Sequence, residues 1–309
     1  MRIAVVDIGS NSTRLFIANT KGGRVEQELE RRTTVTRLGA GVDSNGHLQD
    51  EAMERVYAAL QDYRELIDSH HPDRAVAILT SAVRDAANGE EFARTVGDRY
   101  GLDPHVLTGD EEARLTFLGA VSDRDHGDVA PTLVVDIGGG STELVVGAGA
   151  EITFHVSTQA GVVRQSERHL HHDPPTEEER RELAGDVETL IQKAVPRQQL
   201  RAPERMIAVA GTATSLAAIA QELEPYDPEK VHGYVIGREE CARILDRLAA
   251  LPLDERRQVT GLHPDRAPTI VAGILILLVV LRMFALTAVE VSENDILRGA
   301  ALEFGCGAG

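Results

Sequence analysis

The sequence contains no tryptophan, and aromatic residues make up only 4% of its 309 residues. Cysteine is equally scarce, since Cys241 and Cys306 are the only two. Two cysteines cannot build the disulfide framework of a small secreted domain, so we expect a protein of the reducing cytoplasm. Neither lies in a motif typical of a nucleophilic cysteine, and we expect neither to carry chemistry.

Basic residues are also in short supply. The chain has 32 lysines and arginines against 49 aspartates and glutamates, which gives a formal net charge of −17. This deficit argues against broad binding to nucleic acid or to an anionic membrane, because both need a basic footprint. A small polyanionic substrate is still compatible with the charge if arginines, turn amides and divalent metal make its site locally positive.

The sequence lacks an apolar run long enough to cross a membrane. The run that stands out has 12 residues, from Ile270 to Leu281, whereas a membrane span needs about 20. We expect this run to form a helix buried in the protein core. The N-terminus enters strand-like sequence by Ile3, without the charged leader and apolar segment of a signal peptide.

The sequence does contain two copies of one short pattern, at residues 3–17 and 132–146. Each copy has an apolar β-branched run, then Asp-Ile-Gly, a small polar turn and a second apolar run. This pattern predicts two strands joined by a tight turn, with Asp7 or Asp136 at the end of the first strand. Glycine and serine turns offer backbone N–H groups to phosphate. The repeat therefore predicts duplicated domains that face each other across a cleft and hold a phosphate chain.

The order of the predicted elements indicates the fold class and the domain boundary. Helical and extended patterns alternate along the chain, which is typical of the α/β class. The polar, glycine-containing segment from Ser122 to Asp128 predicts a boundary between a first domain of residues 1–126 and a second of residues 127–309. The last helix, predicted from Asp295 to Phe304, belongs to the second domain or packs back on the first.

Six stretches occur in the order in which one protein family carries them. They are residues 7–12, 80–84, 109–114, 136–143, 210–214 and 263–266, the last followed by the apolar helix and Val291-Ser292-Glu293. In these stretches the chain resembles the short, two-domain form of the Ppx/GppA family of exopolyphosphatases and guanosine pentaphosphate phosphohydrolases. The resemblance implies two ribonuclease-H-like domains of the actin-like ATPase superfamily flanking a cleft.

The resemblance also implies an activity. Members of this family remove the terminal phosphate from inorganic polyphosphate or from guanosine pentaphosphate, with Mg²⁺ or Mn²⁺ as cofactor, and they often form homodimers. An ATPase or kinase of the same superfamily is the alternative. The Glu112 helix and the stretch at residues 80–84 favour the phosphatase, because they match that family's pattern and not the kinases'.

Hydrolysis of a phosphoanhydride needs an aligned water, neutralised phosphate oxygens and a stabilised leaving group. Glu112 matches the family's catalytic glutamate and lies in the first turn of a predicted helix capped by Thr108 or Asp110. From position alone, Glu111 and Glu112 would equally well complement that helix terminus. Arg84 matches a family phosphate contact and is the predicted clamp on substrate oxygens.

Asp7, Asp136 and Glu143 are the predicted Mg²⁺ ligands, because hard carboxylate oxygens suit this ion. Mg²⁺ usually keeps several waters, so we do not expect all three to bind it directly, and Glu143 is also a candidate to act on the water beside Glu112. The predicted phosphate-binding residues occupy the two repeated turns and the start of a later helix. They are Gly9, Ser10, Asn11 and Ser12; Gly138, Gly139, Gly140, Ser141 and Thr142; and Gly211 and Thr212.

Three features have alternative interpretations. Arg14 either contacts phosphate or, by alternation within its strand, lies on a solvated face. Gly211 and Thr212 match the superfamily's nucleotide-binding position or form a strand-to-helix turn with a threonine cap. The cluster of His169, His171, His172 and Asp173 suggests zinc, but its spacing fits no standard site, and we expect a solvated loop.

Overall fold

The computed structural model describes residues 1–125, 127–149 and 151–305. The chain divides into two compact units, which we call unit 1 (Met1–Ser122 and Asn294–Gly309) and unit 2 (Asp123–Glu293). The division falls four residues before the predicted boundary at residue 126. The segment of the last helix belongs to unit 1 and not to the second domain, so unit 2 is an insertion between two parts of unit 1.

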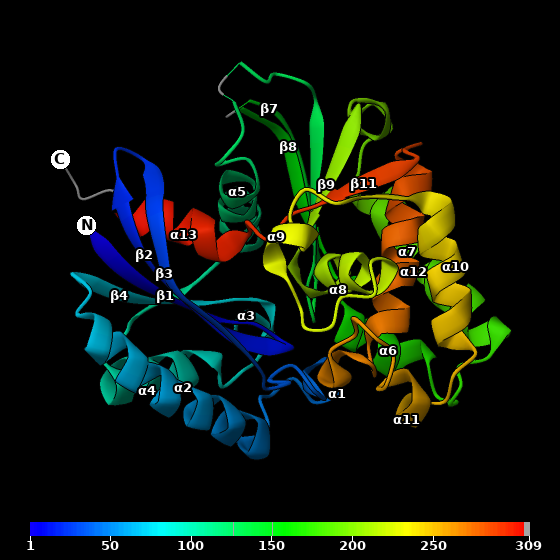
Figure 1. The fold of residues 1–309 in the computed structure, drawn as a ribbon. Helices are drawn as coiled ribbons and strands as arrows, with labels where there is room; N and C mark the ends of the chain where they lie inside the picture. Colours follow the sequence, from blue (N-terminus) through cyan, green and yellow to red (C-terminus); the bar gives the residue numbers. More distant parts are fainter. Residues whose placement is uncertain (126, 150, 306–309) are drawn as a thin grey trace. The chain divides into compact units, whose positions relative to one another are not determined.

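Unit 1 is built on a five-stranded sheet with the order β3-β2-β1-β4-β5 (Figure 1). The first three strands pair antiparallel, whereas β4 runs parallel to β1 and β5 parallel to β4. The strands are β1 (Arg2–Ile8), β2 (Ser12–Lys21), β3 (Arg24–Val35), β4 (Arg74–Leu79) and β5 (Asp103–Val106).

Each face of this sheet has its own apolar core. Ala4 and Val6 pack on one face with side chains of α2 and α4, and Ile3 and Val5 pack on the other with side chains of α5 and α13. Successive residues of a strand point to opposite faces. Asp7 therefore lies on the face that α5 and α13 cover. The helices of unit 1 are α1 (Val42–Asn45), α2 (Asp50–His70), α3 (Ser81–Asp85), α4 (Gly89–Tyr100), α5 (Gly109–Ala120) and α13 (Ile296–Gly305).

Unit 2 repeats this plan in a six-stranded sheet with the order β10-β11-β9-β6-β7-β8. β6, β7 and β8 pair antiparallel, β9 and β11 continue the sheet in parallel from β6, and β10 adds an antiparallel edge strand. The predicted α/β class is confirmed, and the shared topology matches the predicted duplication. The strands are β6 (Thr132–Ile137), β7 (Thr142–Ala148), β8 (Glu151–Thr158), β9 (Arg205–Val209), β10 (Val235–Gly237) and β11 (Ala288–Val291).

The apolar run predicted as a buried helix forms α12 (Ile270–Met283), which packs against α7 and α10 (Figure 1). Its prediction is confirmed, since nearly all of its side chains are buried in the core of unit 2. The sequence did not predict α6. The other helices of unit 2 are α6 (Val162–His169), α7 (Glu177–Ala194), α8 (Ala210–Ala220), α9 (Pro228–Val231), α10 (Arg238–Ala249) and α11 (Leu253–Arg256), with 3₁₀ turns at Gln199–Arg201 and Pro264–Arg266.

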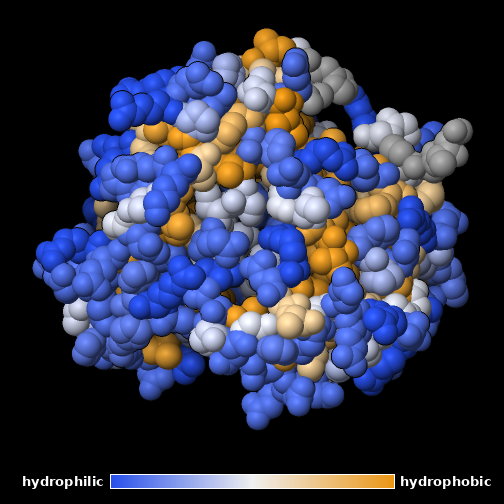
Figure 2. Space-filling view, turned by 180° about the vertical axis from the view of Figure 1, so that it is seen from behind, coloured by the Kyte–Doolittle hydropathy of each residue, from blue (hydrophilic) through white to orange (hydrophobic). Residues whose placement is uncertain are grey.

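Apolar side chains are concentrated in these cores. On the face shown in Figure 2, hydrophilic side chains predominate and hydrophobic ones form separate groups. Within the residues that the structure describes, no helix combines the length and the apolar character needed to cross a membrane. Cys241, on α10, is completely buried, and burial raises the pKa of its thiol to about 12. Cys306 lies outside the described residues.

Helices α5 and α13 cross at two glycines. A β-carbon on Gly119 would lie 1.9 Å from the Asp295 carbonyl oxygen, and one on Gly299 would lie 1.8 Å from the Leu115 carbonyl oxygen. Both distances are far shorter than van der Waals contact, so only glycine allows the two backbones to approach so closely. The crossing holds the helix that carries Glu112 against the segment that begins at Asp295.

Gly299→Ala should therefore destabilise the protein. The added methyl group must push α13 away from α5, and overpacking of this kind costs about 1–3 kcal/mol or more. We expect a lower Tm in thermal unfolding followed by circular dichroism. Gly185→Ala, in α7, is the matched control, because a β-carbon there meets no atom within 4 Å; it should leave the Tm unchanged or raise it. Equal Tm values for the two variants would contradict the close crossing.

Candidate functional site

The turn between β1 and β2 contains the first predicted phosphate-binding segment. The Gly9 N–H donates to the Ser12 carbonyl oxygen over 3.0 Å and closes the turn. A β-carbon on Gly9 would lie 3.2 Å from that oxygen, so glycine suits the tight geometry. The Ser10 hydroxyl lies 3.0 Å from the hydroxyl of Ser81, the first residue of α3. The turn is therefore fixed to the start of the helix that carries Arg84.

The turn between β6 and β7 has the same backbone bond. The Gly138 N–H donates to the Ser141 carbonyl oxygen, also over 3.0 Å. The loop before α6 packs directly on this turn, because a β-carbon on Gly161 would lie 2.2 Å from the carbonyl carbon of Gly140. The Gly139 carbonyl accepts from the first turn of α6. The two copies of the repeat thus form equivalent turns, each supported by a neighbouring helix.

Some polar groups of the turns already have partners within their unit. The Asn11 carbonyl oxygen accepts from the backbone N–H groups of Thr36 and Arg37, at 3.1 and 2.9 Å. The Thr142 hydroxyl donates to the Ala160 carbonyl over 2.6 Å, and Thr142 is fully buried. A hydroxyl has only one hydrogen to donate. The Thr142 side chain therefore supports the fold and has no further hydrogen for a phosphate.

The two copies differ in charge at one register position. Asp7 on β1 faces Arg14 on β2, whereas the equivalent Asp136 on β6 faces Glu143 on β7. The first pair joins opposite charges, and the second places two carboxylates side by side. Both aspartates and Glu143 are buried. A cation next to two neighbouring carboxylates stabilises both charges, so the second pair is a candidate for binding a cation.

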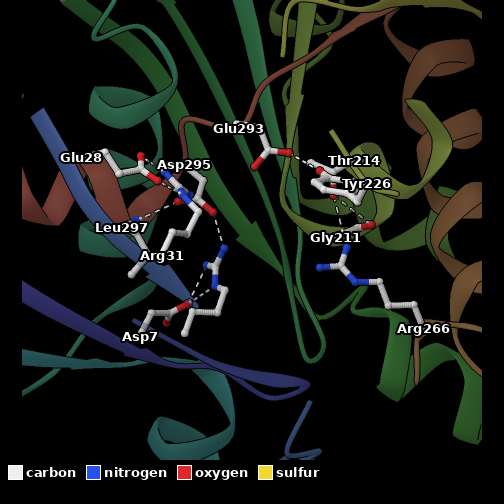
Figure 3. Close-up of polar contacts among 11 residues, drawn as sticks. Asp7, Glu28, Arg31, Gly211, Thr214, Tyr226, Arg266, Glu293, Asp295 and Leu297 are labelled. Atoms are coloured by element: carbon white, nitrogen blue, oxygen red, sulfur yellow. Dashed lines mark hydrogen bonds and ion pairs between the residues drawn. The ribbon is translucent and has the colours of Figure 1, made fainter. Parts of the chain in front are cut away.

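Arg14 does not lie on a solvated face, since its side chain is only 14% exposed. Its Nε and Nη2 atoms donate to Asp7 Oδ2 over 2.8 and 2.6 Å, and its Nη1 donates to Asp295 (Figure 3). Asp7 Oδ1 is buried and has no hydrogen-bond partner in the described part of the chain. Burial raises the pKa of Asp7, and Arg14 opposes that shift.

Glu143 is held from the neighbouring strand β8. The Ser157 hydroxyl donates to Glu143 Oε1 over 2.8 Å, and the two residues are register partners. Among the described residues, no group of three or more His, Cys, Asp or Glu side chains is placed to hold a metal ion. Mg²⁺ commonly uses one or two carboxylates together with waters and substrate phosphates. The carboxylates of Asp136 and Glu143, which are register partners on neighbouring strands, suit such an ion by their chemistry, and so does the unpartnered Oδ1 of Asp7.

Glu112 forms a buried ion pair with the predicted phosphate clamp. Arg84 Nη1 donates to Glu112 Oε2 over 3.0 Å and to the Leu107 carbonyl oxygen over 2.8 Å. Burial raises the pKa of Glu112 to about 7; Arg84 opposes the shift, and the charges of Asp7 and Asp85 add to it. A carboxyl group that titrates near neutral pH is suited to accept and return a proton during catalysis.

The start of α5 separates the roles of its two glutamates. Thr108 is the N-cap: its hydroxyl accepts from the Glu111 N–H, and the Glu111 carboxylate accepts from the Thr108 N–H over 2.8 Å. The alternative cap, Asp110, is therefore wrong. Glu111 therefore complements the helix N-terminus, the role that the sequence allowed for both glutamates. Glu112 takes no part in this capping box and pairs with Arg84 instead.

The third predicted phosphate-binding position lies at the start of α8. This helix begins at Ala210, with Val209 as its N-cap and no side-chain capping bond, so the alternative of a cap at Thr212 is wrong. The Arg266 guanidinium covers Gly211, because a β-carbon there would lie 2.2 Å from Arg266 Nη1 (Figure 3). The structure thus places a cationic side chain over the first turn of α8.

The sequence matches one protein family along nearly the whole chain. The model of the Ppx/GppA phosphatase family matches residues 16–302. The chain belongs to this family. Exopolyphosphatase 2 of Mycobacterium tuberculosis is 36% identical over 97% of this chain and 98% of its own length. The bifunctional 3-dehydroquinate synthase/phosphatase of Fusobacterium nucleatum is 32% identical over 97% of this chain, which covers 46% of that protein.

Solved structures of the Ppx/GppA family share the fold. An exopolyphosphatase-like protein has a TM-score of 0.92 at 34% identity, covering 98% of this chain and 97% of its own. The Aquifex aeolicus family member has a TM-score of 0.81 at 34% identity, covering 99% and 97%. These matches confirm the predicted pair of ribonuclease-H-like domains. Membership of the family places the chain among hydrolases that act on phosphoanhydride bonds.

Two side chains of this Ppx/GppA site were not predicted. Ser157 lies in the third strand of its unit, and only the register with Glu143 marks it. For Asp295, the sequence predicted only that it begins the last helix. The sequence does contain one signal for Arg14. When the two copies of the repeat are aligned, Arg14 occupies the position of Glu143, which indicates a site residue and not a generic surface arginine.

The histidine loop is organised around Glu179. The backbone N–H groups of His171 and His172 and the His172 ring contact Glu179 Oε1 at 2.8 to 3.1 Å. Glu179 also completes the capping box of α7 with Thr176. Burial alone would raise the pKa of Glu179, but these hydrogen bonds outweigh it and lower the pKa to about 2. His169 lies apart from this group, 3.4 Å from Asp186.

Glu112→Gln should make the protein more stable at pH 8 and hardly change its stability at pH 4. The folded pKa of about 7 lies above the ordinary value of 4.5, so the folded state binds the proton more tightly than the unfolded state. The stability this provides is present below pH 4.5 and is lost as the pH rises through 7. Glutamine removes that loss of stability, which is on the order of 3 kcal/mol for a shift of this size. Urea unfolding across this pH range measures the difference.

Glu111→Gln is the control, and its effect should have the opposite sign. Hydrogen bonds from Thr108 lower the pKa of Glu111. Its stabilisation is therefore present above the ordinary pKa and is lost as the pH falls through the lowered value. If the two variants changed stability in the same direction between pH 4 and 8, the assignment of distinct environments to these neighbours would be wrong.

Proposed function

We propose that this protein is an exopolyphosphatase that removes terminal orthophosphate from inorganic polyphosphate by hydrolysis, with Mg²⁺ or Mn²⁺ as cofactor. The observation that carries the proposal is the buried Glu112–Arg84 pair, in which a carboxyl group with a pKa near 7 lies beside a guanidinium group. The substrate is supported by the relative of nearly equal length that is named an exopolyphosphatase.

Glu112 acts on the water. As the water oxygen bonds to the terminal phosphorus, Glu112 accepts a proton, and the bond from that phosphorus to the bridging oxygen breaks. The shortened polyphosphate leaves with the electron pair of that bond. Glu112 then returns its proton to the released phosphate or to solvent. A base whose pKa lies near the working pH suits both steps.

Arg84 holds Glu112 and also faces the charge of the substrate. Both of its hydrogen bonds in the described part of the chain come from Nη1. An arginine has five N–H donors in a planar fork, so the same side chain can contact phosphate oxygens through Nη2. In each unit, N–H groups of the glycine-serine turn other than the one that closes it bind further phosphate oxygens.

The cofactor has candidate ligands in Asp136 and Glu143, with Asp7 as a third. When bound, Mg²⁺ neutralises phosphate oxygens as negative charge develops on the leaving group. The hydrogen bond from Ser157 orients Glu143, which is the register partner of Asp136 on the neighbouring strand. Arg14 fixes Asp7 in the same way.

The alternatives share parts of this chemistry. Guanosine pentaphosphate presents the same terminal anhydride, so the pair of Glu112 and Arg84 would serve it equally. An ATPase or kinase is less well supported, because Arg266 covers the start of α8 where the superfamily places its nucleotide. We further propose a cytoplasmic homodimer, on the basis of the family resemblance and the cysteine content; light scattering on the purified protein tests the dimer.

Glu112→Gln should lower kcat about 10²- to 10⁴-fold, the usual contribution of a general base, with a much smaller change in KM. The assay measures phosphate release from short polyphosphate, long polyphosphate, guanosine pentaphosphate and ATP, with Mg²⁺ and with EDTA. Polyphosphate should be hydrolysed fastest, and only with the metal. Glu111→Gln is the matched control and should keep near-wild-type activity. A near-wild-type rate for Glu112→Gln would refute the mechanism, and faster hydrolysis of guanosine pentaphosphate would refute the substrate.

The pH profile of kcat/KM should rise through about pH 7, because Glu112 must be deprotonated to accept a proton. Arg84 lowers this pKa, whereas burial and the charges of Asp7 and Asp85 raise it. Arg84→Gln should therefore move the rising limb to higher pH, and Arg84→Lys, which keeps the charge, should move it less. If the wild type, Arg84→Gln and Arg84→Lys all showed the rising limb at the same pH, Glu112 would not control the pH profile.

A further inference from the structure

Asp295 uses its two carboxylate oxygens for different purposes. Oδ1 accepts the backbone N–H of Leu297 over 3.0 Å, which satisfies one of the free N–H groups at the start of α13. Oδ2 accepts from Arg14 Nη1. One oxygen therefore caps the helix, and the other binds an arginine that lies 281 positions earlier in the chain.

Arg14 links Asp295 to Asp7. Its Nε and Nη2 atoms donate to Asp7, and its Nη1 atom donates to Asp295, so the two carboxylates contact different donors of one guanidinium group. Both aspartate side chains are only 5% exposed, and Arg14 is 14% exposed. Charges so well shielded from water interact more strongly than surface pairs and tolerate the loss of a partner poorly.

The second carboxylate fixes the plane of the guanidinium. With one partner, an arginine can rotate about its side-chain torsions and still keep that contact. With a carboxylate at each end of its fork, the planar group has one orientation that satisfies both. Asp7 Oδ2 accepts two of the donors, which opposes rotation of the carboxylate and thereby favours one direction for its unpartnered Oδ1.

We propose that Asp295 is a positioning residue of the phosphatase site: through Arg14 it holds Asp7 in the orientation that presents Oδ1 to the cofactor or to its bound water. This inference rests on the proposed function. The backbone supports it too, since the Asp295 carbonyl lies against Gly119 of α5. The helix pair that carries Glu112 therefore also anchors the residue that orients Asp7.

Asp295→Asn separates the two purposes of this side chain. Asparagine caps a helix as well as aspartate does, so the bond to Leu297 and the Tm should be kept. Its amide NH₂ cannot accept from Arg14. We expect kcat for phosphate release to fall about 10- to 100-fold, as is typical when a group that orients a metal ligand is lost. We expect a similar fall in affinity for Mn²⁺, measured by electron paramagnetic resonance without substrate.

Glu303→Gln is the matched control on the same helix. It removes the exposed ion pair that Glu303 makes with Arg114 of α5, at 2.8 Å, and leaves Asp295 untouched. This variant should keep both the turnover and the Mn²⁺ affinity of the wild type. Asp295→Ala removes the cap as well as the partner of Arg14, so it should lower the Tm in addition.

A double-mutant cycle decides between positioning and a merely structural role. If Asp295 acts through Arg14, then Asp295→Asn should cause no further loss in an Arg14→Ala background. The proposal is supported if kcat or Mn²⁺ affinity falls in Asp295→Asn and this loss disappears without Arg14. It is overturned if neither quantity falls, or if the loss persists in full without Arg14.

The proposed function and the positioning role fail in distinguishable ways. A wild-type protein that releases no phosphate from any of the four substrates would refute the function. The Mn²⁺ affinities of the same variants would still decide whether Asp295 orients Asp7, because they are measured without turnover.

Discussion

A buried carboxylate must have a partner, and this requirement shapes the site of this Ppx/GppA protein. Removing a charge from water costs several kcal/mol unless an opposite charge or strong hydrogen bonds replace the lost hydration. Unit 1 meets the requirement with arginines, pairing Asp7 with Arg14 and Glu112 with Arg84. Unit 2 places Asp136 opposite Glu143, where a serine hydroxyl contributes one hydrogen bond. This difference in charge is the basis on which we propose Asp136 and Glu143 as ligands of the cation.

The duplication explains how one turn supplies two kinds of chemistry. Both units use the same strand order and the same bond from the first glycine of the turn to the carbonyl three residues on. A single substitution at the register position opposite the aspartate, arginine at 14 and glutamate at 143, changes the local charge by two. The fold is therefore repeated, while the electrostatics of the copies have diverged. In the proposed function, the shared backbone turn binds phosphate, and the residues that differ between the copies bind the metal.

The sequence predicted those features that depend on local pattern. The repeated strands and turns, the buried helix α12 and the α/β class all follow from the periodicity of apolar residues. The structure places Glu112 beside Arg84, two residues that the family motifs singled out, although the distance between them in sequence gives no sign of the contact. Helix α6 escaped prediction because its apolar side chains, such as Val162 and Val163, are too few to show a helical period.

Other features depend on long-range geometry that no local pattern contains. Alternation along β2 assigns Arg14 to one face of the sheet, but it cannot tell whether solvent or another element covers that face. The element that covers this face is α13, which comes from the far end of the chain. The different roles of Glu111 and Glu112 could likewise be assigned only from the capping geometry at Thr108, because the two side chains have the same chemistry.

The return of α13 has a consequence for assembly. Residues 1–122 supply the whole sheet of unit 1, but Ile3 and Val5 are covered on one face by apolar side chains of α13 as well as α5. Without α13 and the Asp295 that precedes it, that face would lose part of its core, and Arg14 would lose its contact with the Asp295 carboxylate. Since all of unit 2 intervenes in the chain, the core of unit 1 closes through contacts of very long sequence separation, whose formation carries the entropic cost of closing a long loop. The same step that completes the core also gives Arg14 its second carboxylate, so the orientation of Asp7 depends on the complete fold of unit 1.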